Sequence, residues 1–248
     1  MSGEPRAISE APRAIVTGGT RGIGAAISRR LIADGFQVVA TYRSNVEAAE
    51  RMRGELGERF AAIAVDGGDA AAVTAFAAGL EAGPVDLLVN NAGISDASLV
   101  HQTLPATAEA VFRANLFQAV HFVGAFLPAM MRRKRGDIVM ISSLAAGNVR
   151  AGNSLYGASK AALERYALGV ALEAARFNVA VNVIAPGFVR TELSEGVLDE
   201  GREREIRASL PTRKLTEPEE IAEAVVLLAA RKPMLVGAVL PVGGGGQI

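Results

Sequence analysis

The chain has 248 residues, enough for one large α/β domain or two small ones, and 50% of them are hydrophobic, which provides for a buried core. Basic and acidic residues each number 26, so the net charge is zero and argues against a nucleic-acid-binding protein. The absence of cysteine excludes disulfides and cysteine-ligated zinc, and the only two histidines, His101 and His121, are too few and too separate in sequence to predict a metal site.

The start of the chain has no apolar core of the kind found in secretory signals. We expect residues 1–12 to form a flexible leader and the protein to be cytoplasmic. The most apolar stretch, 116–131, is interrupted by Gln118, His121 and Pro128 and is shorter than a membrane span. It predicts a buried helix and no membrane partner.

Short apolar runs alternate with alanine-rich helical runs along the rest of the chain. Because these runs are apolar at nearly every position, we expect parallel strands with both faces covered by helices. The pattern predicts an α/β fold, a single-domain doubly wound parallel sheet (Rossmann-like) over residues 13–248. A charged segment at about 187–216 breaks the alternation and predicts a lid. The predicted strands are 14–17, 37–42, 60–65, 85–90, 137–142, 179–185 and 238–242.

A glycine-rich loop, Thr-Gly-Gly-Thr-Arg-Gly-Ile-Gly at 17–24, directly follows the first predicted strand and precedes a helical run. Glycines let the backbone turn tightly and approach a pyrophosphate, which binds at the positive end of the following helix. The order of strand, loop and helix therefore predicts a dinucleotide site with the spacing G-x-x-x-G-x-G. The predicted contacts are Gly18, Thr20, Arg21, Gly22, Ile23 and Gly24.

Tyr156 lies four residues before Lys160 and thirteen after Ser143. On a helix, residues four apart share a face, so the phenol and the ammonium would point into the same cleft. A phenol titrates near pH ~10, and a neighbouring cation favours the phenolate and lowers that pKa. The pair could then exchange a proton with an oxygen atom that Ser143 holds. The pair taken alone also fits a solvated lysine beside a half-buried tyrosine.

Together with the glycine loop, this pair makes the chain resemble the short-chain dehydrogenases/reductases from about residue 13 onward. Asn-Asn-Ala-Gly at 90–93 ends the fourth predicted strand, as it does in that family. Asn115 matches the family's helix asparagine, Ser143 its catalytic serine, and 186–191 its nicotinamide-side turn. The resemblance implies hydride transfer between a nicotinamide and a carbonyl or secondary alcohol.

The resemblance also implies a role for each matching residue. Tyr156 would be the general acid or base, and Lys160 would lower its pKa and bind the nicotinamide ribose. Ser143, rather than the adjacent Ser142, would donate a hydrogen bond to the carbonyl oxygen. Asn115 would hold a water of the proton return path, although capping a broken helix is an alternative role. Further implied cofactor contacts are Asp66, Asn91, Ala92, Gly93, Pro186, Gly187, Val189 and Thr191.

The residues after the second predicted strand favour NADP over NAD. An acidic residue there would hold the 2′-hydroxyl of NAD, but this chain has Thr-Tyr-Arg-Ser at 41–44. Arg43 and Arg21 each offer a planar guanidinium to a 2′-phosphate, unless both are merely solvated. Asp66 matches the family acceptor for the adenine amino group. Gly67 and Gly68 stand where the family usually has an aliphatic residue that covers the adenine.

Length and the segment 211–222 are most similar to 3-oxoacyl-(acyl-carrier-protein) reductases, which implies an acyl-thioester substrate and fatty acid biosynthesis. Dehydrogenases of a sugar, a steroid or a small alcohol share these motifs and stay open. A catalytically silent nucleotide-binding regulatory protein is the alternative of another class. The basic run 132–135 fits a helix terminus or a docking surface for an acidic carrier protein. The helix at 156–176 and the tail 243–248 resemble family interfaces and imply a homodimer or homotetramer.

Overall fold

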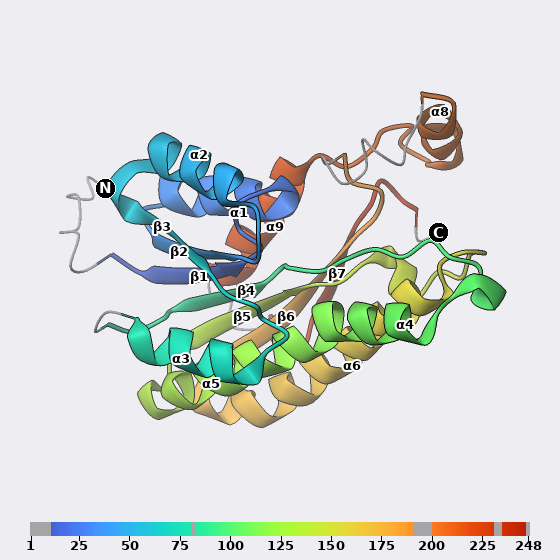
Figure 1. Ribbon diagram of the computed structural model, residues 1–248. Coiled ribbons are helices and arrows are strands. Elements are labelled where there is room, and N and C mark those ends of the chain that lie inside the picture. The colour runs from blue at the N-terminus through green and yellow to red at the C-terminus, as the bar shows by residue number, and fades with distance from the viewer. Residues whose placement is uncertain (1–10, 81–82, 191–199, 231–234, 247–248) are drawn as a thin grey trace.

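A single parallel sheet of seven strands organises the chain (Figure 1), in the order β3-β2-β1-β4-β5-β6-β7. The computed structural model describes residues 11–80, 83–190, 200–230 and 235–246. All seven predicted strands are present within one or two residues of their expected ends, so the doubly wound α/β prediction is confirmed. The strands are β1 (Arg13–Thr17), β2 (Gln37–Tyr42), β3 (Phe60–Ala64), β4 (Leu87–Asn90), β5 (Gly136–Ile141), β6 (Val179–Pro186) and β7 (Val239–Val242).

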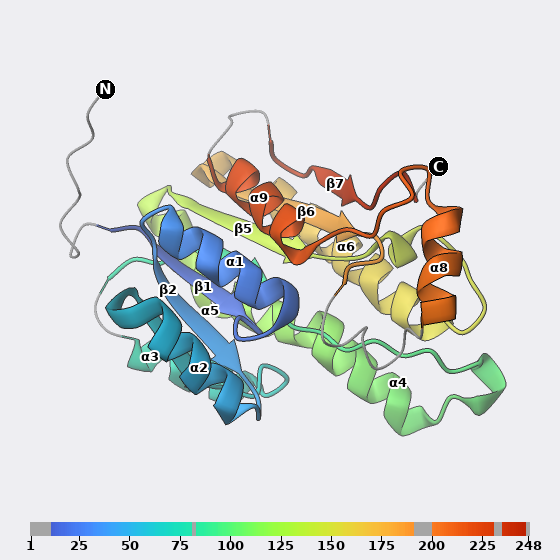
Figure 2. The same cartoon turned by 90° about the horizontal axis from the view of Figure 1, so that it is seen from above.

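Helices cover both faces of the sheet (Figures 1 and 2). Their apolar sides and the two sheet faces form two separate hydrophobic clusters. The first cluster includes α1 (Gly22–Ala33), α2 (Val46–Leu56) and α9 (Pro218–Ala229). The second includes α3 (Ala70–Gly79), α5 (Gln118–Arg133) and α6 (Ser154–Ala174). Other helical elements of the described residues are α4 (Pro105–Phe112), α8 (Glu200–Ser209) and the short turns η2 (Gly57–Arg59), η3 (Val100–Gln102), η5 (Leu144–Ala146) and η6 (Ala175–Phe177).

The central strands are mostly apolar because both of their faces are covered. Every residue of β4 and β5 is buried. Successive side chains of β1 point to opposite faces, with Ala14 and Val16 in the first cluster and Ile15 in the second. Consecutive apolar residues therefore fit a strand whose two faces both pack against helices.

The strand order reverses at β1, which pairs with β2 on one side and β4 on the other. In a doubly wound sheet, the loops that leave two such neighbouring strands diverge and open a crevice at their carboxyl ends. The glycine loop follows β1, and the Asn-Asn-Ala-Gly segment includes the end of β4. The topology thus brings together two segments that are more than seventy residues apart in the chain.

The apolar stretch belongs to one continuous helical run, 105–133, in which a π-helical turn, η4 (Arg113–Phe117), joins α4 to α5. By length and composition alone the run could span a membrane, with 33% of its most apolar window buried inside the structure. Phe122 and Phe126 stack on each other and contact Phe76 of α3 in the second cluster. Packing against the sheet explains the apolar composition of this face.

Phe122 provides a test of this packing, because its side chain is completely buried while Phe117, one turn earlier, is 49% exposed. We expect Phe122→Ala to lower the free energy of unfolding by about 3–5 kcal/mol through lost burial and an unfilled cavity. Phe117→Ala, the matched control, should cost less than about 1 kcal/mol. Urea unfolding at equilibrium measures both values, and equal losses would contradict the assigned packing.

Candidate active site

The glycine loop approaches neighbouring backbone too closely for side chains. A Cβ atom on Gly24 would stand 2.1 Å from the Gly18 carbonyl oxygen and 2.6 Å from the Asn91 amide nitrogen. Gly18 and Gly22 also have φ angles of +63° and +50°, a region that favours glycine. The loop ends at Gly22, the first residue of α1, so backbone N–H groups at a helix N-terminus face the crevice. This is a cradle for a phosphate group.

The segment after β4 is hydrogen-bonded to the end of β1. The Thr17 hydroxyl accepts hydrogen bonds from the backbone amides of Asn91 and Ala92, each at 3.0 Å. The Asn91 side-chain amide donates to the Thr17 carbonyl at 3.0 Å. These bonds hold the predicted cofactor contacts at 91–93 beside the glycine loop.

Three of the four predicted catalytic side chains meet at the carboxyl end of β5 and the start of α6. Ser143 lies just beyond β5, and Tyr156 and Lys160 lie on the first turns of α6. Ser143 lies close enough to Tyr156 for a side-chain hydrogen bond with it to lower the pKa of the phenol. The Lys160 ammonium lies 5.9 Å from the centre of the Tyr156 ring. A helical i, i+4 pair and a strand end therefore build the arrangement that the spacing predicted.

Lys160 is buried, and its Nζ donates to the Ile141 carbonyl at 2.9 Å. Burial lowers the pKa of Lys160 to about 8, and the negative charge of Glu164, one turn further along α6, opposes that shift. Partial burial raises the pKa of Glu164 itself, while a hydrogen bond with Ser142 and the charge of Lys160 lower it. A charged network thus extends behind the catalytic group.

The expectation that Lys160 lowers the pKa of Tyr156 is wrong for this structure. Burial raises the pKa of the phenol, and the hydrogen bond with Ser143 is the influence that opposes the shift. The physical reason is that the ammonium points to the Ile141 carbonyl and not to the phenol oxygen. Tyr156 is therefore protonated at neutral pH.

Asn115 is buried in the π-helical turn and joins two parts of the site. Its Oδ1 accepts from the Ile94 amide at 2.8 Å, and its Nδ2 donates to the Ile94 carbonyl and the Ser159 hydroxyl, each at 2.9 Å. The side chain thus links the segment after β4 to α6 at a break in the regular helix. These bonds define a bridging role that was not predicted; the water relay and the capping of a broken helix both stay predictions.

Arg21 and Arg43 are exposed at the mouth of the crevice, one in the glycine loop and one just after β2. Within the part of the chain that the structure describes, neither forms a salt bridge with a carboxylate. Asp66, after β3, uses one carboxylate oxygen to accept from the Gly68 amide at 3.0 Å. Its second oxygen is available to a ligand.

The predicted nicotinamide-side turn starts at Pro186, the last residue of β6. The Gly187 amide donates to the Val242 carbonyl at 2.8 Å, and Val189 pairs with Thr216. Thr191 lies outside the described residues. Within the predicted lid, α8 is packed by a small cluster of Phe188, Ile206, Leu210 and Leu215. The segment thus contains a short helix, and its movement as a lid stays a prediction.

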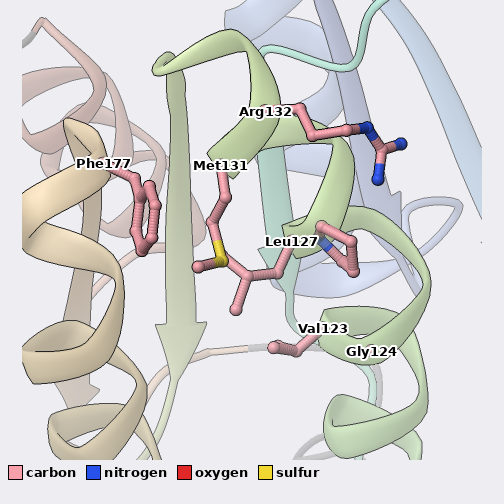
Figure 3. A pocket seen from close by; sticks show the side chains of 7 residues that line it. Val123, Gly124, Leu127, Met131, Arg132 and Phe177 are labelled. Carbon is pink, nitrogen blue, oxygen red and sulfur yellow. The ribbon is translucent and has the colours of Figure 1, made fainter.

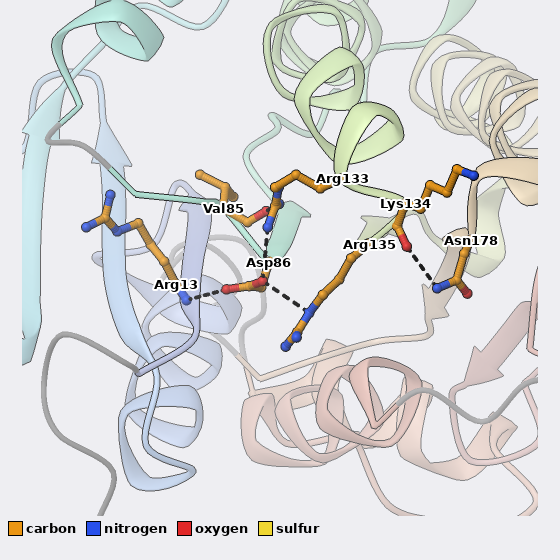
Figure 4. Close-up of polar contacts among 7 residues, drawn as sticks. All are labelled: Arg13, Val85, Asp86, Arg133, Lys134, Arg135 and Asn178. Carbon is orange, nitrogen blue, oxygen red and sulfur yellow. Dashed lines mark hydrogen bonds and ion pairs between the residues drawn. The ribbon is translucent and has the colours of Figure 1, made fainter.

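The basic run at 132–135 lies at the amino-terminal end of β5, away from the cleft, which does not fit docking of a carrier protein beside the cleft. Figure 4 shows the contacts of this run. Residues 132–135 come just before β5, whereas Ser143 comes just after it, so a six-residue strand separates them by about 20 Å. Arg133 and Arg135 pair with Asp86 at 3.4 and 3.5 Å, and Arg133 also donates to the Val85 carbonyl at 2.6 Å. The cluster ends α5 and fixes the amino-terminal edge of the sheet.

The fold and the site define a class of proteins that bind a nucleotide at the switch point of a parallel sheet. A family model described as short chain dehydrogenase matches residues 12–201. The chain belongs to the short-chain dehydrogenase/reductase family of oxidoreductases.

Characterised relatives match nearly the whole chain. An acetoacetyl-CoA reductase of Shinella zoogloeoides is 35% identical over 238 residues, 94% of this chain and 97% of the relative. A 3-oxoacyl-(acyl-carrier-protein) reductase of Salmonella typhimurium is 34% identical over 235 residues, 94% and 96% of the two chains. A solved structure titled ElxO with NADP bound is 27% identical and has a TM-score of 0.89, covering 95% of this chain and 98% of that one.

Two residues of this site escaped the sequence reasoning. Glu164 follows Lys160 at the same i+4 interval that singled out Tyr156, so the spacing rule could have found it. Ser159 accepts from Asn115 and donates to the Tyr156 carbonyl at 2.7 Å, which spacing alone does not reveal. Both contacts depend on how α6 is rotated against the sheet.

Buried Lys160 is predicted to lower the free energy of unfolding at pH values below about 8, where it is charged in the folded protein. Its ordinary value is 10.5, so between about pH 8 and 10.5 the unfolded chain binds more protons than the folded one, and stability due to this group rises with pH. We expect Lys160→Met to raise the free energy of unfolding at pH 7 by about 1–3 kcal/mol and to flatten this rise.

Urea unfolding of both proteins at pH 7 and pH 9.5 checks the prediction. Tyr156 is present in both proteins, so its titration cancels in the comparison. A variant that is less stable than the parent at pH 7 would contradict it.

Proposed function

We propose that the protein is an NADP-dependent reductase of 3-oxoacyl thioesters. The observation that carries the proposal is the meeting of Ser143, Tyr156 and the buried Lys160 at the carboxyl end of β5, the same edge of the sheet that carries the glycine loop. A binding protein gains nothing from burying Lys160, whose charged form is disfavoured there. This argues against the catalytically silent alternative.

The charges at the crevice support NADP as the cofactor. The close-packed glycine loop fits a pyrophosphate, and exposed Arg21 and Arg43 fit a 2′-phosphate. The ElxO structure with the same fold was solved with NADP. When bound, the reduced cofactor would supply the hydride to the substrate carbon.

Residues of the chain bind the carbonyl oxygen of the substrate and supply the proton that it receives. Ser143 donates a hydrogen bond to the carbonyl oxygen as negative charge develops on it. Tyr156, protonated because burial raises its pKa, transfers its proton to that oxygen as the carbon accepts hydride, which gives an alcohol. Lys160 would hold the nicotinamide ribose, as the family resemblance implies, and the tyrosine would regain its proton before the next turnover. Asn115 and Ser159 hold α6 at the required position.

The substrate proposal rests on the relatives and on apolar residues of the loops that follow β4 and β5. The relatives are named for reduction of acetoacetyl-CoA and of 3-oxoacyl groups on a carrier protein. Leu99, Val100, Leu104 and Val149 are exposed large apolar side chains on these loops. They suit an acyl chain better than a sugar. Reduction of a carrier-bound acyl group would place the protein in fatty acid biosynthesis, with the carrier docking elsewhere than at 132–135.

We further propose that the protein forms a homodimer or homotetramer through α5 and α6. An apolar hollow of about 410 Å³ lies between the end of α5 and η6 (Figure 3), lined by Val123, Gly124, Leu127, Pro128, Met131, Arg132 and Phe177. On α6, Leu172 is 83% exposed. Exposed apolar surface of this kind supports association. A cytoplasmic location likewise stays a prediction.

Tyr156→Phe tests the chemistry. We expect NADPH-dependent reduction of acetoacetyl-CoA to fall at least about 100-fold because the general acid is lost. NADPH affinity should change less than about fivefold, because one hydroxyl is lost from the site. Steady-state kinetics and a fluorescence titration measure the two effects. Tyr166→Phe, on the same helix, is the matched control and should retain activity. Near-parental turnover by Tyr156→Phe would leave the binding-protein alternative in place.

Arg21→Met and Arg43→Met test the cofactor. Each should lower kcat/KM for NADPH by about 10- to 100-fold, since each removes a charge-assisted hydrogen bond to the 2′-phosphate. The value for NADH should stay within about twofold. Arg29→Met, which removes an exposed cation paired with Glu55, serves as the control. Parallel losses with both cofactors would contradict recognition of the 2′-phosphate.

A further inference from the structure

The turn after β3 departs from the family pattern at Gly67 and Gly68, and the structure shows what occupies the vacated space. A Cβ atom on Gly67 would stand 2.3 Å from Oε1 and 3.0 Å from Cδ of Gln118. A Cβ atom on Gly68 would stand 2.7 Å from Cγ of Arg113. Two polar side chains from the η4–α5 region therefore lie where an aliphatic side chain would begin. Either glycine alone could be replaced only if its neighbour moved.

The orientation of the Gln118 amide is fixed by its hydrogen bonds. Its Nε2 donates to the Ala92 carbonyl at 2.8 Å and to the Ala114 carbonyl at 3.0 Å. Both partners are acceptors, so the nitrogen must face them and the oxygen must face the turn after β3. Among the described residues, no hydrogen bond to Oε1 is found, and this oxygen is not among the buried atoms that lack a partner. Gln118 thus presents an oriented, accessible acceptor.

The surrounding turn is held in place from both sides. His121, one turn after Gln118 on α5, has its Nδ1 3.0 Å from the Gly67 carbonyl; because that carbonyl can only accept, Nδ1 carries the proton. Asp66 closes the turn by accepting from the Gly68 amide. The Gln118 acceptor therefore lies between Ala92, a predicted cofactor contact, and the turn that carries Asp66, the predicted acceptor for the adenine amino group.

We infer that Gln118 is a specificity residue for the adenine base of the cofactor. The 6-amino group of adenine carries two N–H donors. Asp66 accepts one and Gln118 Oε1 accepts the other. A base with a carbonyl oxygen at position 6 would face two acceptors and be disfavoured. The inference rests on the proposed NADP dependence but concerns the opposite end of the cofactor from the hydride.

The test compares binding of NADPH with that of its analogue in which hypoxanthine replaces adenine. Titrations followed by the fluorescence of the reduced nicotinamide, which both ligands share, give the two dissociation constants for each protein. The parent should bind NADPH at least about tenfold more tightly than the analogue. Gln118→Met, which keeps the length of the side chain but removes the acceptor, should reduce this ratio by about three- to tenfold, mainly through weaker NADPH binding.

Gln118→Ser, which leaves the space beside Gly67 empty, should also reduce the preference for NADPH over the analogue. This variant replaces Gln118→Met in the test if the methionine variant fails to fold. Gln37→Met, the same substitution at the amino-terminal end of β2, is the control and should leave the ratio unchanged. A parental ratio near one would overturn the inference. So would Gln118 variants that lose affinity for both ligands equally, since that result would make Gln118 merely structural. Failure of the parent to bind either ligand would instead refute the proposed NADP dependence.

Discussion

The contact between the backbone after β1 and the backbone after β4 is the constraint on which the site depends. The Thr17 hydroxyl accepts from two amides of the 91–92 segment, and Gly24 lies against the Gly18 carbonyl with no room for a side chain. A polar side chain at the end of a buried strand thus satisfies backbone donors that would otherwise be orphaned. Because the loops after β1 and β4 are bonded to each other, the phosphate cradle and the catalytic group keep fixed positions relative to each other.

The catalytic group is costly to the fold. Lys160 is buried with one hydrogen bond to a backbone carbonyl, and Glu164 compensates only in part from a half-buried position. The phenol of Tyr156 is kept neutral by the same burial that depresses the lysine pKa. Burial therefore acts on the two residues in opposite senses, and both shifts favour a neutral site. A negatively charged cofactor would favour the charged lysine again.

Much of the fold and the core of the site could be predicted from the sequence. Continuous apolar strands, the glycine loop and the Tyr156–Lys160 interval are local patterns, and local patterns fix periodicity and order along the chain. The orientation of the Lys160 ammonium could not be predicted, because it depends on where the Ile141 carbonyl lies after the sheet forms. The position of the basic run at 132–135 could have been predicted, because residues that precede β5 lie at its amino end and the site forms at the carboxyl ends of the strands.

The Gly67–Gln118 contact has a consequence for how the sequence can change. A Cβ atom on residue 67 would stand 2.3 Å from Oε1 of Gln118, so a larger residue at position 67 requires the end of the Gln118 side chain to move. Such a movement would break the hydrogen bonds from Gln118 to the Ala92 and Ala114 carbonyls, so an aliphatic residue at position 67 is better matched by a small residue at 118. The effect of a substitution at one of the two positions therefore depends on the residue at the other. A chimera that takes the turn after β3 from one relative and α5 from another would meet a steric clash at this contact, far from the reacting atoms.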